Sequence, residues 1–305
     1  MTEKIDAYQI VTDRIISALE TGTIPWRKPW NSSMPMNVAS KKAYRGINTM
    51  LLGLAGYSSP YWGTYKQWIA LGGQVRKGEK STPIVFWKFL QVEDKKTKKD
   101  KKVPLLRYYN VFNCDQIDFM EGFSAPSNGD KLEFSPIEAC EAIIAGYTNK
   151  PNVETGDKAC YIPLLDSIKM PSKESFHSIP EWYSTLFHEF THSTGHTSRL
   201  NRDGIMQFDE FGSDRYSKEE LIAELGSAFI CFETGIGEYT LTNSEAYIAG
   251  WLKVLKGDKK LVTMASASAQ KAVDHMKGIK PFKDHTSECT AGEANEAGEF
   301  VCSCK

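Results

Sequence analysis

The chain has 305 residues, of which 41% are hydrophobic and 25% are charged, a composition typical of a globular protein with a buried core. It has no apolar run long enough to span a bilayer, and its polar N-terminus does not resemble a signal peptide, so we expect a cytoplasmic protein with no membrane partner. The 7 cysteines have irregular spacing, which argues against a secreted disulfide framework and favours a reducing compartment.

The net charge of −1 conceals an uneven distribution along the chain. Residues 1–125 contain 14 lysines and 5 arginines against 11 acidic residues, a net charge of +8, whereas residues 126–305 have a net charge of −9. This asymmetry favours a half that binds a polyanion, joined to an acidic half with another role. A stretch rich in glycine, serine and proline at 122–130 predicts the linker between two domains, which the length of the chain also favours.

The first half combines short helices with one long hairpin. Apolar residues at helical spacing, with glycines where helices end, predict three helices, at 5–19, 48–54 and 64–71. Two β-rich runs at 84–92 and 103–112 enclose a lysine-rich segment, and this pattern predicts a β-hairpin with a solvated tip.

The second half is expected to be mainly helical. Helices are predicted at 135–145, 178–193, 217–232, 244–255 and 258–276, and a short strand at 159–163. Residues 286–305 lack periodicity and are expected to form a disordered tail that includes the last cysteines. The predicted fold class is therefore α+β: a small α+β domain at 1–125 followed by a mainly helical domain at 126–285.

An H-E-x-x-H motif at His188, Glu189 and His192 lies inside the predicted 178–193 helix. Residues four apart project from one face of a helix, so both imidazoles can bind one Zn²⁺ at about 2.0–2.1 Å. Glu189 stands beside them as a base for the attacking water. Chance produces this pattern in roughly one chain in a hundred of this length. We therefore interpret it as a metal centre.

A third ligand has to come from another part of the chain. His196 stands two residues too early for the third histidine of a metzincin. Glu220 and Glu224 are stronger candidates, because they share one face of the predicted 217–232 helix, for which Ser217 is the expected N-cap. One carboxylate on the metal and the other bonded to a ligand imidazole is a common arrangement, and the residues alone leave open which is which.

The first half also contains the residue types that hold single-stranded DNA, since such sites combine basic side chains with aromatic rings on which bases stack. Arg45 and Asn48 are the favoured contacts, because polar side chains have less reason to be buried. The candidate DNA-binding residues are Tyr44, Arg45, Asn48, Trp62, Lys66, Arg76, Lys77 and Lys80.

These residues carry a resemblance to the ArdC-type antirestriction proteins of conjugative plasmids and integrative elements. The matching runs lie at 42–52, 60–67, 71–80, 111–116, 161–171, 188–200 and 219–229. The helix that contains Glu220 is similar, too, to the third-ligand helices of ImmA/IrrE-type proteases and of gluzincins. Both similarities imply that Glu220 is the ligand and that Glu224 orients a ligand histidine, although gluzincins have an aspartate where this chain has Glu224.

The resemblance implies a single-stranded-DNA-binding domain at 1–125 and a zincin-like metallopeptidase domain at 126–285. It implies one Zn²⁺ per chain, or another divalent metal, and a role in protecting mobile-element DNA from host restriction. The expected partners are single-stranded DNA and an unidentified protein substrate, for which a host restriction component is a candidate. Two alternatives remain open: a DNA-coating protein with a structural or vestigial metal site, and a protease that repairs DNA–protein crosslinks.

Overall fold

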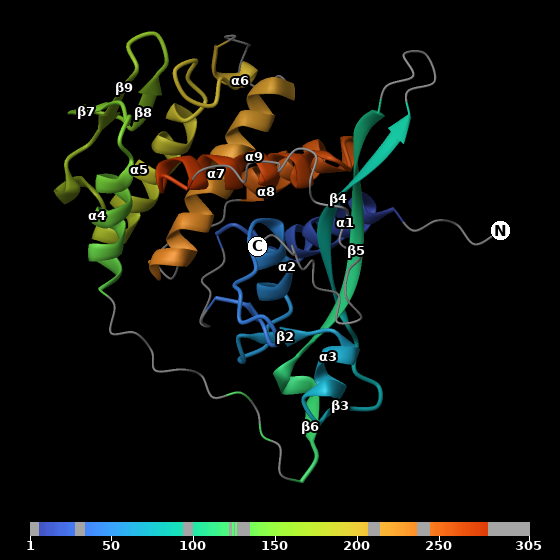
Figure 1. The fold of residues 1–305 in the computed structure, drawn as a ribbon. Coiled ribbons are helices and arrows are strands. Elements are labelled where there is room, and N and C mark those ends of the chain that lie inside the picture. Colours follow the sequence, from blue (N-terminus) through green and yellow to red (C-terminus); the bar gives the residue numbers. More distant parts are fainter. Residues whose placement is uncertain are drawn as a thin grey trace, which may run out of the picture.

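The computed structural model describes residues 6–27, 34–93, 100–121, 124, 126, 135–206, 214–236 and 245–279. The expected tail at 286–305, most of the expected linker and the lysine-rich tip of the hairpin lie outside these residues. None of the described helices is both long and apolar enough to cross a membrane. The mixture of helices and short sheets confirms the predicted α+β class (Figure 1).

The N-terminal region is built on a four-stranded sheet with the strand order β1-β2-β5-β4. Its elements are α1 (Ala7–Glu20), β1 (Met36–Asn37), α2 (Ile47–Gly53), β2 (Tyr61–Gly63), α3 (Tyr65–Ala70), β3 (Gly73–Val75), β4 (Thr82–Glu93), β5 (Asp100–Asn113), a 3₁₀ turn (Cys114–Gln116) and β6 (Ile117–Phe119). The three helices begin within two residues of the predicted positions. Side-chain caps fix the start of α1, where Asp6 accepts a hydrogen bond from the Tyr8 amide, and of α3, where Thr64 forms a capping box with Gln67.

The predicted hairpin forms one continuous antiparallel ladder, from the Thr82–Val111 pair to the Glu93–Asp100 pair. Asn48 on α2 attaches the helix to this hairpin. Its side-chain amide donates to the carbonyl of Val85 and accepts from the amide of Val85, both at 2.8 Å, and Asn48 is buried.

The C-terminal region contains six helices among its described residues and one three-stranded sheet with the order β7-β9-β8. Its elements are α4 (Pro136–Gly146), β7 (Asn152–Thr155), β8 (Cys160–Ile162), β9 (Ser167–Met170), a 3₁₀ turn (Lys173–Ser175), α5 (Ile179–Ser193), α6 (Asp203–Met206), α7 (Asp214–Thr234), α8 (Glu245–Gly257) and α9 (Leu261–Met276). The predicted N-cap at Ser217 is wrong, because α7 begins at Asp214 and Ser217 lies within its first turn.

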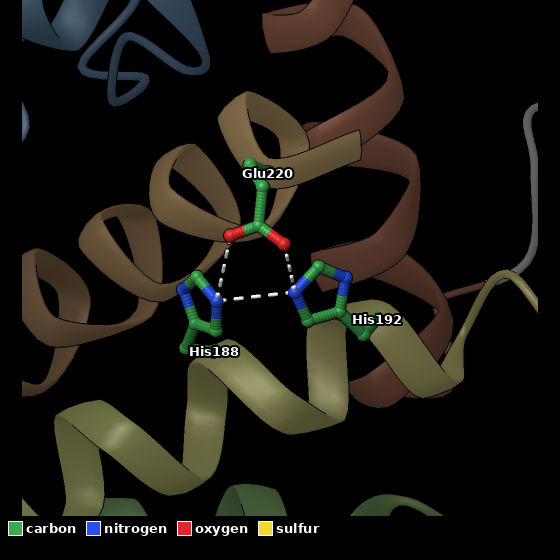
Figure 2. A group of neighbouring side chains, drawn as sticks. All are labelled: His188, His192 and Glu220. Carbon is green, nitrogen blue, oxygen red and sulfur yellow. Dashed lines mark hydrogen bonds and ion pairs between the residues drawn. The ribbon is translucent and has the colours of Figure 1, made fainter. Parts of the chain in front are cut away.

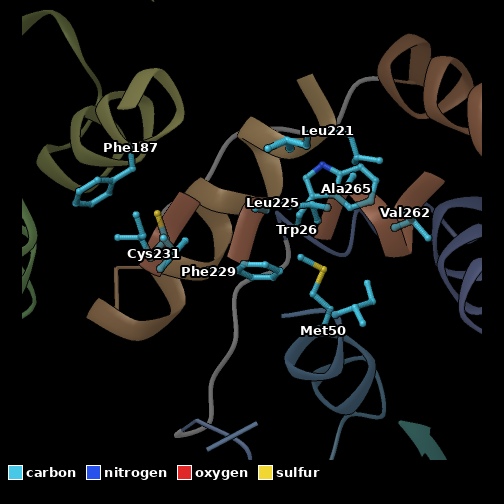
Figure 3. Close-up of a cluster of buried hydrophobic side chains, with 14 of the residues drawn as sticks. Trp26, Met50, Phe187, Leu221, Leu225, Phe229, Cys231, Val262 and Ala265 are labelled. Atoms are coloured by element: carbon cyan, nitrogen blue, oxygen red, sulfur yellow. The ribbon is translucent and has the colours of Figure 1, made fainter. Parts of the chain in front are cut away.

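The two regions share one hydrophobic core. Trp26 and Met50 from the N-terminal region belong to the same buried cluster as Leu225, Phe229 and Val262 (Figure 3). The rings of Trp26 and Trp251 meet edge to face at 5.6 Å. Helix α1 packs against α8 and α9, so the basic region is in direct contact with the helical region that follows it in the chain.

Helices α5 and α7 make a close contact at Gly226. A Cβ atom at this position would stand 2.5 Å from Cγ2 of Thr191 on α5, nearer than side-chain atoms can approach, and Thr191 is fully buried. The missing side chain therefore allows the two backbones to approach. This contact brings the motif helix and the helix of the candidate carboxylates together.

Candidate metal centre

Helix α5 presents the H-E-x-x-H motif because one of its faces is buried. Its start is defined by Ser178, whose hydroxyl accepts a hydrogen bond from the amide of Glu181. Tyr183, Phe187 and Phe190 are almost completely buried in the core, so the rotation of the helix about its axis is fixed. The two motif histidines lie on a different face, which is directed towards α7.

His188, His192 and Glu220 come together at one point between α5 and α7 (Figure 2). The two Nε2 atoms are 3.1 Å apart, and the carboxylate oxygens of Glu220 lie 3.6 Å from Nε2 of His188 and 3.5 Å from Nε2 of His192. Ligand atoms at about 2.0–2.2 Å around a tetrahedral ion are about 3.3–3.6 Å apart. Both distances between Glu220 and the imidazoles fall in this range, and the Nε2–Nε2 distance of 3.1 Å lies just below it, so the donor set fits a single divalent ion after a small outward shift of the rings.

His188 is already under the influence of the surrounding carboxylates. Burial alone would lower the pKa of His188, but the interaction with Glu220 and the negative charges of Glu224 and Glu189 raise it to about 8. Such a concentration of negative charge around two imidazoles favours a cation at this point.

Glu189 is buried beside the three donors and is fixed by the edge of the small sheet. Its Oε2 accepts a hydrogen bond of 2.8 Å from the backbone amide of Tyr161 on β8. The side chain of Tyr161 in turn donates to Asp166 at 2.8 Å, and Asp166 forms an ion pair with Arg199. This chain of contacts holds the edge strand against α5.

His192 has a second carboxylate neighbour on its other side. Its buried Nδ1 has no hydrogen-bond partner among the residues that the structure describes, and it faces Oε1 of Glu219 at 3.6 Å. Arg202 donates to both oxygens of Glu219, at 2.6 and 3.0 Å. Burial by itself would raise the pKa of Glu219, but His192 and Arg202 outweigh it and hold that pKa below its usual value. Glu219 is therefore an ionised acceptor in position to orient the His192 ring.

Glu224 takes part in a different set of contacts. Its Oε1 accepts from Arg27 at 2.8 Å and from the hydroxyl of Tyr247 at 2.7 Å, and Trp26 donates to that same hydroxyl at 3.1 Å. The guanidinium of Arg27 also lies over the Tyr247 ring, 4.0 Å from its centroid. Glu224 thus joins α7 to the N-terminal region, one helical turn from Glu220.

His196 lies outside the group of three donors. Its Nδ1 is 2.8 Å from the hydroxyl of Ser198 and 4.0 Å from a carboxylate oxygen of Asp166. The structure therefore places it beside the Tyr161–Asp166–Arg199 contacts rather than with His188 and His192.

The predicted DNA contacts have very different environments. Tyr44, Asn48 and Trp62 are buried, so their rings and amide are not on the surface. Arg45 is half exposed and forms an ion pair with Asp274 on α9. The remaining four cationic candidates are exposed, namely Lys66, Arg76, Lys77 and Lys80. Of these, Arg76 is paired with acidic neighbours.

Sequence reasoning does not identify Glu219, Arg202 or Tyr161. Glu219 immediately precedes Glu220, and neighbours on a helix point about 100° apart, so a pattern based on spacing by four passes over it. The sequence signal that could have indicated it is Arg202, one of two arginines that closely follow the motif. Tyr161 acts through its backbone amide, so the identity of its side chain gives no signal of this role.

Two family models match the chain. The N-terminal domain of anti-restriction factor ArdC matches residues 5–112, and a zincin-like metallopeptidase matches residues 138–268. Fold and site together thus define a zincin-like metallopeptidase domain behind an N-terminal domain of ArdC type.

Two crystal structures of the antirestriction ArdC protein from the R388 plasmid are similar to this chain over 90% of its length and 98% of theirs. The metal-free form has a TM-score of 0.70 at 42% identity, and the Mn(II)-bound form 0.69 at 41%. The DNA primase TraC of Escherichia coli is 36% identical over 297 residues, but this chain spans only 20% of that relative's length. The chain belongs to the family of ArdC antirestriction proteins.

Proposed function

We propose that this chain is a single-stranded-DNA-binding, metal-dependent peptidase with an antirestriction role. The observation that carries the proposal is the meeting of His188, His192 and Glu220 at one point, with the carboxylate of Glu189 next to them on α5. Two imidazoles, one carboxylate and an adjacent acid are the components of a hydrolytic metal site.

The donors fit a divalent ion, and we propose one ion per chain, Zn²⁺ or Mn²⁺. Nitrogen donors together with a carboxylate suit Zn²⁺, and the Mn(II)-bound form of the R388 protein supports a divalent metal in general. When bound, such an ion supplies a Lewis acid that lowers the pKa of water and polarises a carbonyl group.

The residues of the chain provide the proton transfer and the positioning. Glu189 accepts the proton of the attacking water and passes it to the leaving amine. The amide of Tyr161 keeps its carboxylate in place, at the edge strand β8. Glu219, held by Arg202, fixes the orientation of His192.

The DNA-binding part of the proposal rests on the N-terminal region. Its net charge of +8 favours a polyanion, and its match to the ArdC N-terminal domain is consistent with action on incoming DNA in the cytoplasm. The protein substrate would be a component that associates with this DNA, with host restriction components as one class of candidates.

A Glu189→Gln variant tests the peptidase function. Glutamine retains an oxygen that can accept from the Tyr161 amide, but it cannot act as a base, so metal content and DNA affinity should persist while protein cleavage is lost. Metal content is measured by elemental analysis, and cleavage of an unfolded protein is measured with and without single-stranded DNA. Glu181→Gln, on the same helix but bonded to the His177 amide, is the matched control and should leave cleavage intact.

The same variant separates the peptidase from the DNA-coating alternative. A wild-type chain that binds DNA and metal but cleaves no protein would contradict the peptidase function. If Glu189→Gln still protects DNA from restriction in cells, protection depends on binding alone. If cleavage is confined to proteins crosslinked to DNA, the crosslink-repair alternative gains support.

A further inference from the structure

Few aromatic rings of the described residues are exposed. Tyr44 and Trp62, which we expected to stack on bases, are 7% and 2% exposed. Rings with large exposed fractions belong to Tyr65 at 48%, Phe86 at 40% and Tyr109 at 39%. A ring has to be accessible to stack on a base, so these three rings are the candidates for a stacking site.

Phe86 and Tyr109 stand together on one face of the β4–β5 hairpin. Tyr109 is paired with Ile84 across the ladder, and Phe86 is paired with Arg107, so all four side chains lie on the same face. The rings of Phe86 and Tyr109 are 5.6 Å apart at an angle of 71°, and Arg107 beside them is exposed.

The opposite face of the hairpin has the structural role. Val85 and Leu106 are buried in the shared core, and Trp87 packs there against Tyr8. Successive residues of a strand alternate between faces, so Phe86 and Arg107 point away from this core. On their own face Ile84 and Val111 are buried against Leu52 and Trp62, so the exposed part of this face, within the described stretch of the hairpin, consists of Phe86, Arg107 and Tyr109.

The chemistry of this face fits a single-stranded nucleic acid. Two aromatic rings offer faces to unpaired bases, and the guanidinium of Arg107 offers a partner to a phosphate; within the described part of the chain no carboxylate pairs with it. The same hairpin continues to a sequence with six lysines between residues 95 and 102. A duplex hides its bases in the stack and cannot use the rings in this way.

We propose that Phe86, Tyr109 and Arg107 form the platform on which single-stranded DNA stacks. This assignment rests on the DNA binding proposed above and places it on the exposed part of the hairpin. Phe86, Tyr109 and Arg107 thereby replace Tyr44, Asn48 and Trp62 as the proposed contacts. Exposed lysines such as Lys66 and Lys77 then contribute to the electrostatic field rather than to stacking.

The platform is tested by the binding of a fluorescent oligothymidylate to the full chain, followed by anisotropy. Phe86→Val and Tyr109→Val keep strand-forming residues at exposed positions and should each weaken binding about 5- to 150-fold, the range for the loss of one stacked base. Tyr65→Leu removes the third exposed ring, on α3, and should leave the affinity unchanged.

Arg107→Gln gives an independent readout. The slope of log Kd against log salt should fall by about 0.7 for the loss of one phosphate contact with a single strand. The two valine variants should keep the wild-type slope, since stacking releases no counterions. Thermal unfolding of all variants shows whether the fold is retained.

The outcomes distinguish the platform from the proposed function. A wild-type chain that does not bind the oligonucleotide refutes both. Wild-type affinity in Phe86→Val and Tyr109→Val, or an equal loss in Tyr65→Leu, refutes the platform while leaving DNA binding intact. Tighter binding of an oligouridylate would assign the platform to RNA, and equal binding of a duplex would exclude stacking of unpaired bases.

Discussion

Glu219→Gln should weaken metal binding although Glu219 is not one of the three converging donors. The carboxylate lies 3.6 Å from Nδ1 of His192. Two full charges at that distance attract by about 4.6 kcal/mol at an effective dielectric constant of about 20. A metal-bound imidazole carries only part of a charge. About a third of that energy, ~1.5 kcal/mol, corresponds to a tenfold loss of affinity, at the lower end of the usual range for such partners.

The matched control is Glu224→Gln, on the same helix. Glu224, like Glu219, is ion-paired with an arginine. Its partners are Arg27 and Tyr247, however, and not a ligand histidine. Because Glu224 acts on His188 only through its negative charge, we expect this variant to lose less metal affinity than Glu219→Gln. Removing the charge of Glu219 also leaves Arg202 without its ionic partner, which costs up to about 3–5 kcal/mol of stability for a buried pair, although Arg202 keeps its hydrogen bonds to Thr194 and Thr191.

The assay is a competition titration of the metal against a chromophoric chelator, performed on protein shown to be folded by circular dichroism. Urea unfolding of the same variants gives the stability loss separately. An equal or larger loss of metal affinity in Glu224→Gln would refute the assignment of Glu219. It would instead restore Glu224 as the residue that orients a ligand histidine.

Three further outcomes are expected. Glu220→Gln should reduce metal affinity more than either Glu219→Gln or Glu224→Gln, because it removes a converging donor; an order with Glu224 first would move the ligand. Gly226→Ala should lower the unfolding free energy by about 1–3 kcal/mol in urea titrations, despite a gain of about 1 kcal/mol in helix propensity, since its Cβ would overlap a buried threonine on α5. His188, whose pKa is about 8 without metal, is protonated below that pH, so the ion must displace its proton. Calorimetry in two buffers should therefore show about 0.9 proton released from this group at pH 7 and about 0.1 at pH 9, whereas a release of only about 0.2 proton at pH 7, as for an imidazole of ordinary pKa, would refute the shift.

The elements that could be predicted are those with strong local signals. Helix α5 was expected at 178–193 and spans Ile179–Ser193, because a serine cap and an apolar stripe define both its start and its buried face. Helix α7 begins three residues before its predicted cap, since Ser217 is tolerated inside a helix that has already started. Strands of two to four residues such as β1, β7 and β9 are too short for an alternating pattern.

The functional site, too, could be predicted only where the sequence has a strong local signal. The motif predicted which residues converge on α5, because spacing by four is a geometric property of the helix. Which side chains of the N-terminal region are exposed could not be predicted, since the polarity of a residue does not determine whether it is buried or on the surface. Asn48 is polar but buried, because its side-chain amide bonds the backbone of Val85. Phe86, the residue after Val85, is apolar but exposed.

The contacts between the two regions determine how these functions can be measured. Thr12 on α1 bonds the carbonyl of Lys259 at 2.7 Å, and Arg27 bonds Glu224 one turn from Glu220. A buried apolar side chain contributes about 1.5–3 kcal/mol, so separating α1 from its partners would remove an amount comparable to the total stability of a domain, about 5–15 kcal/mol. We therefore expect the basic region and the metal centre to fold together, even though separate family models match them. On this expectation, a DNA-platform variant that keeps wild-type metal affinity is folded, and so is a metal-centre variant that keeps wild-type DNA affinity, because both properties depend on the shared core.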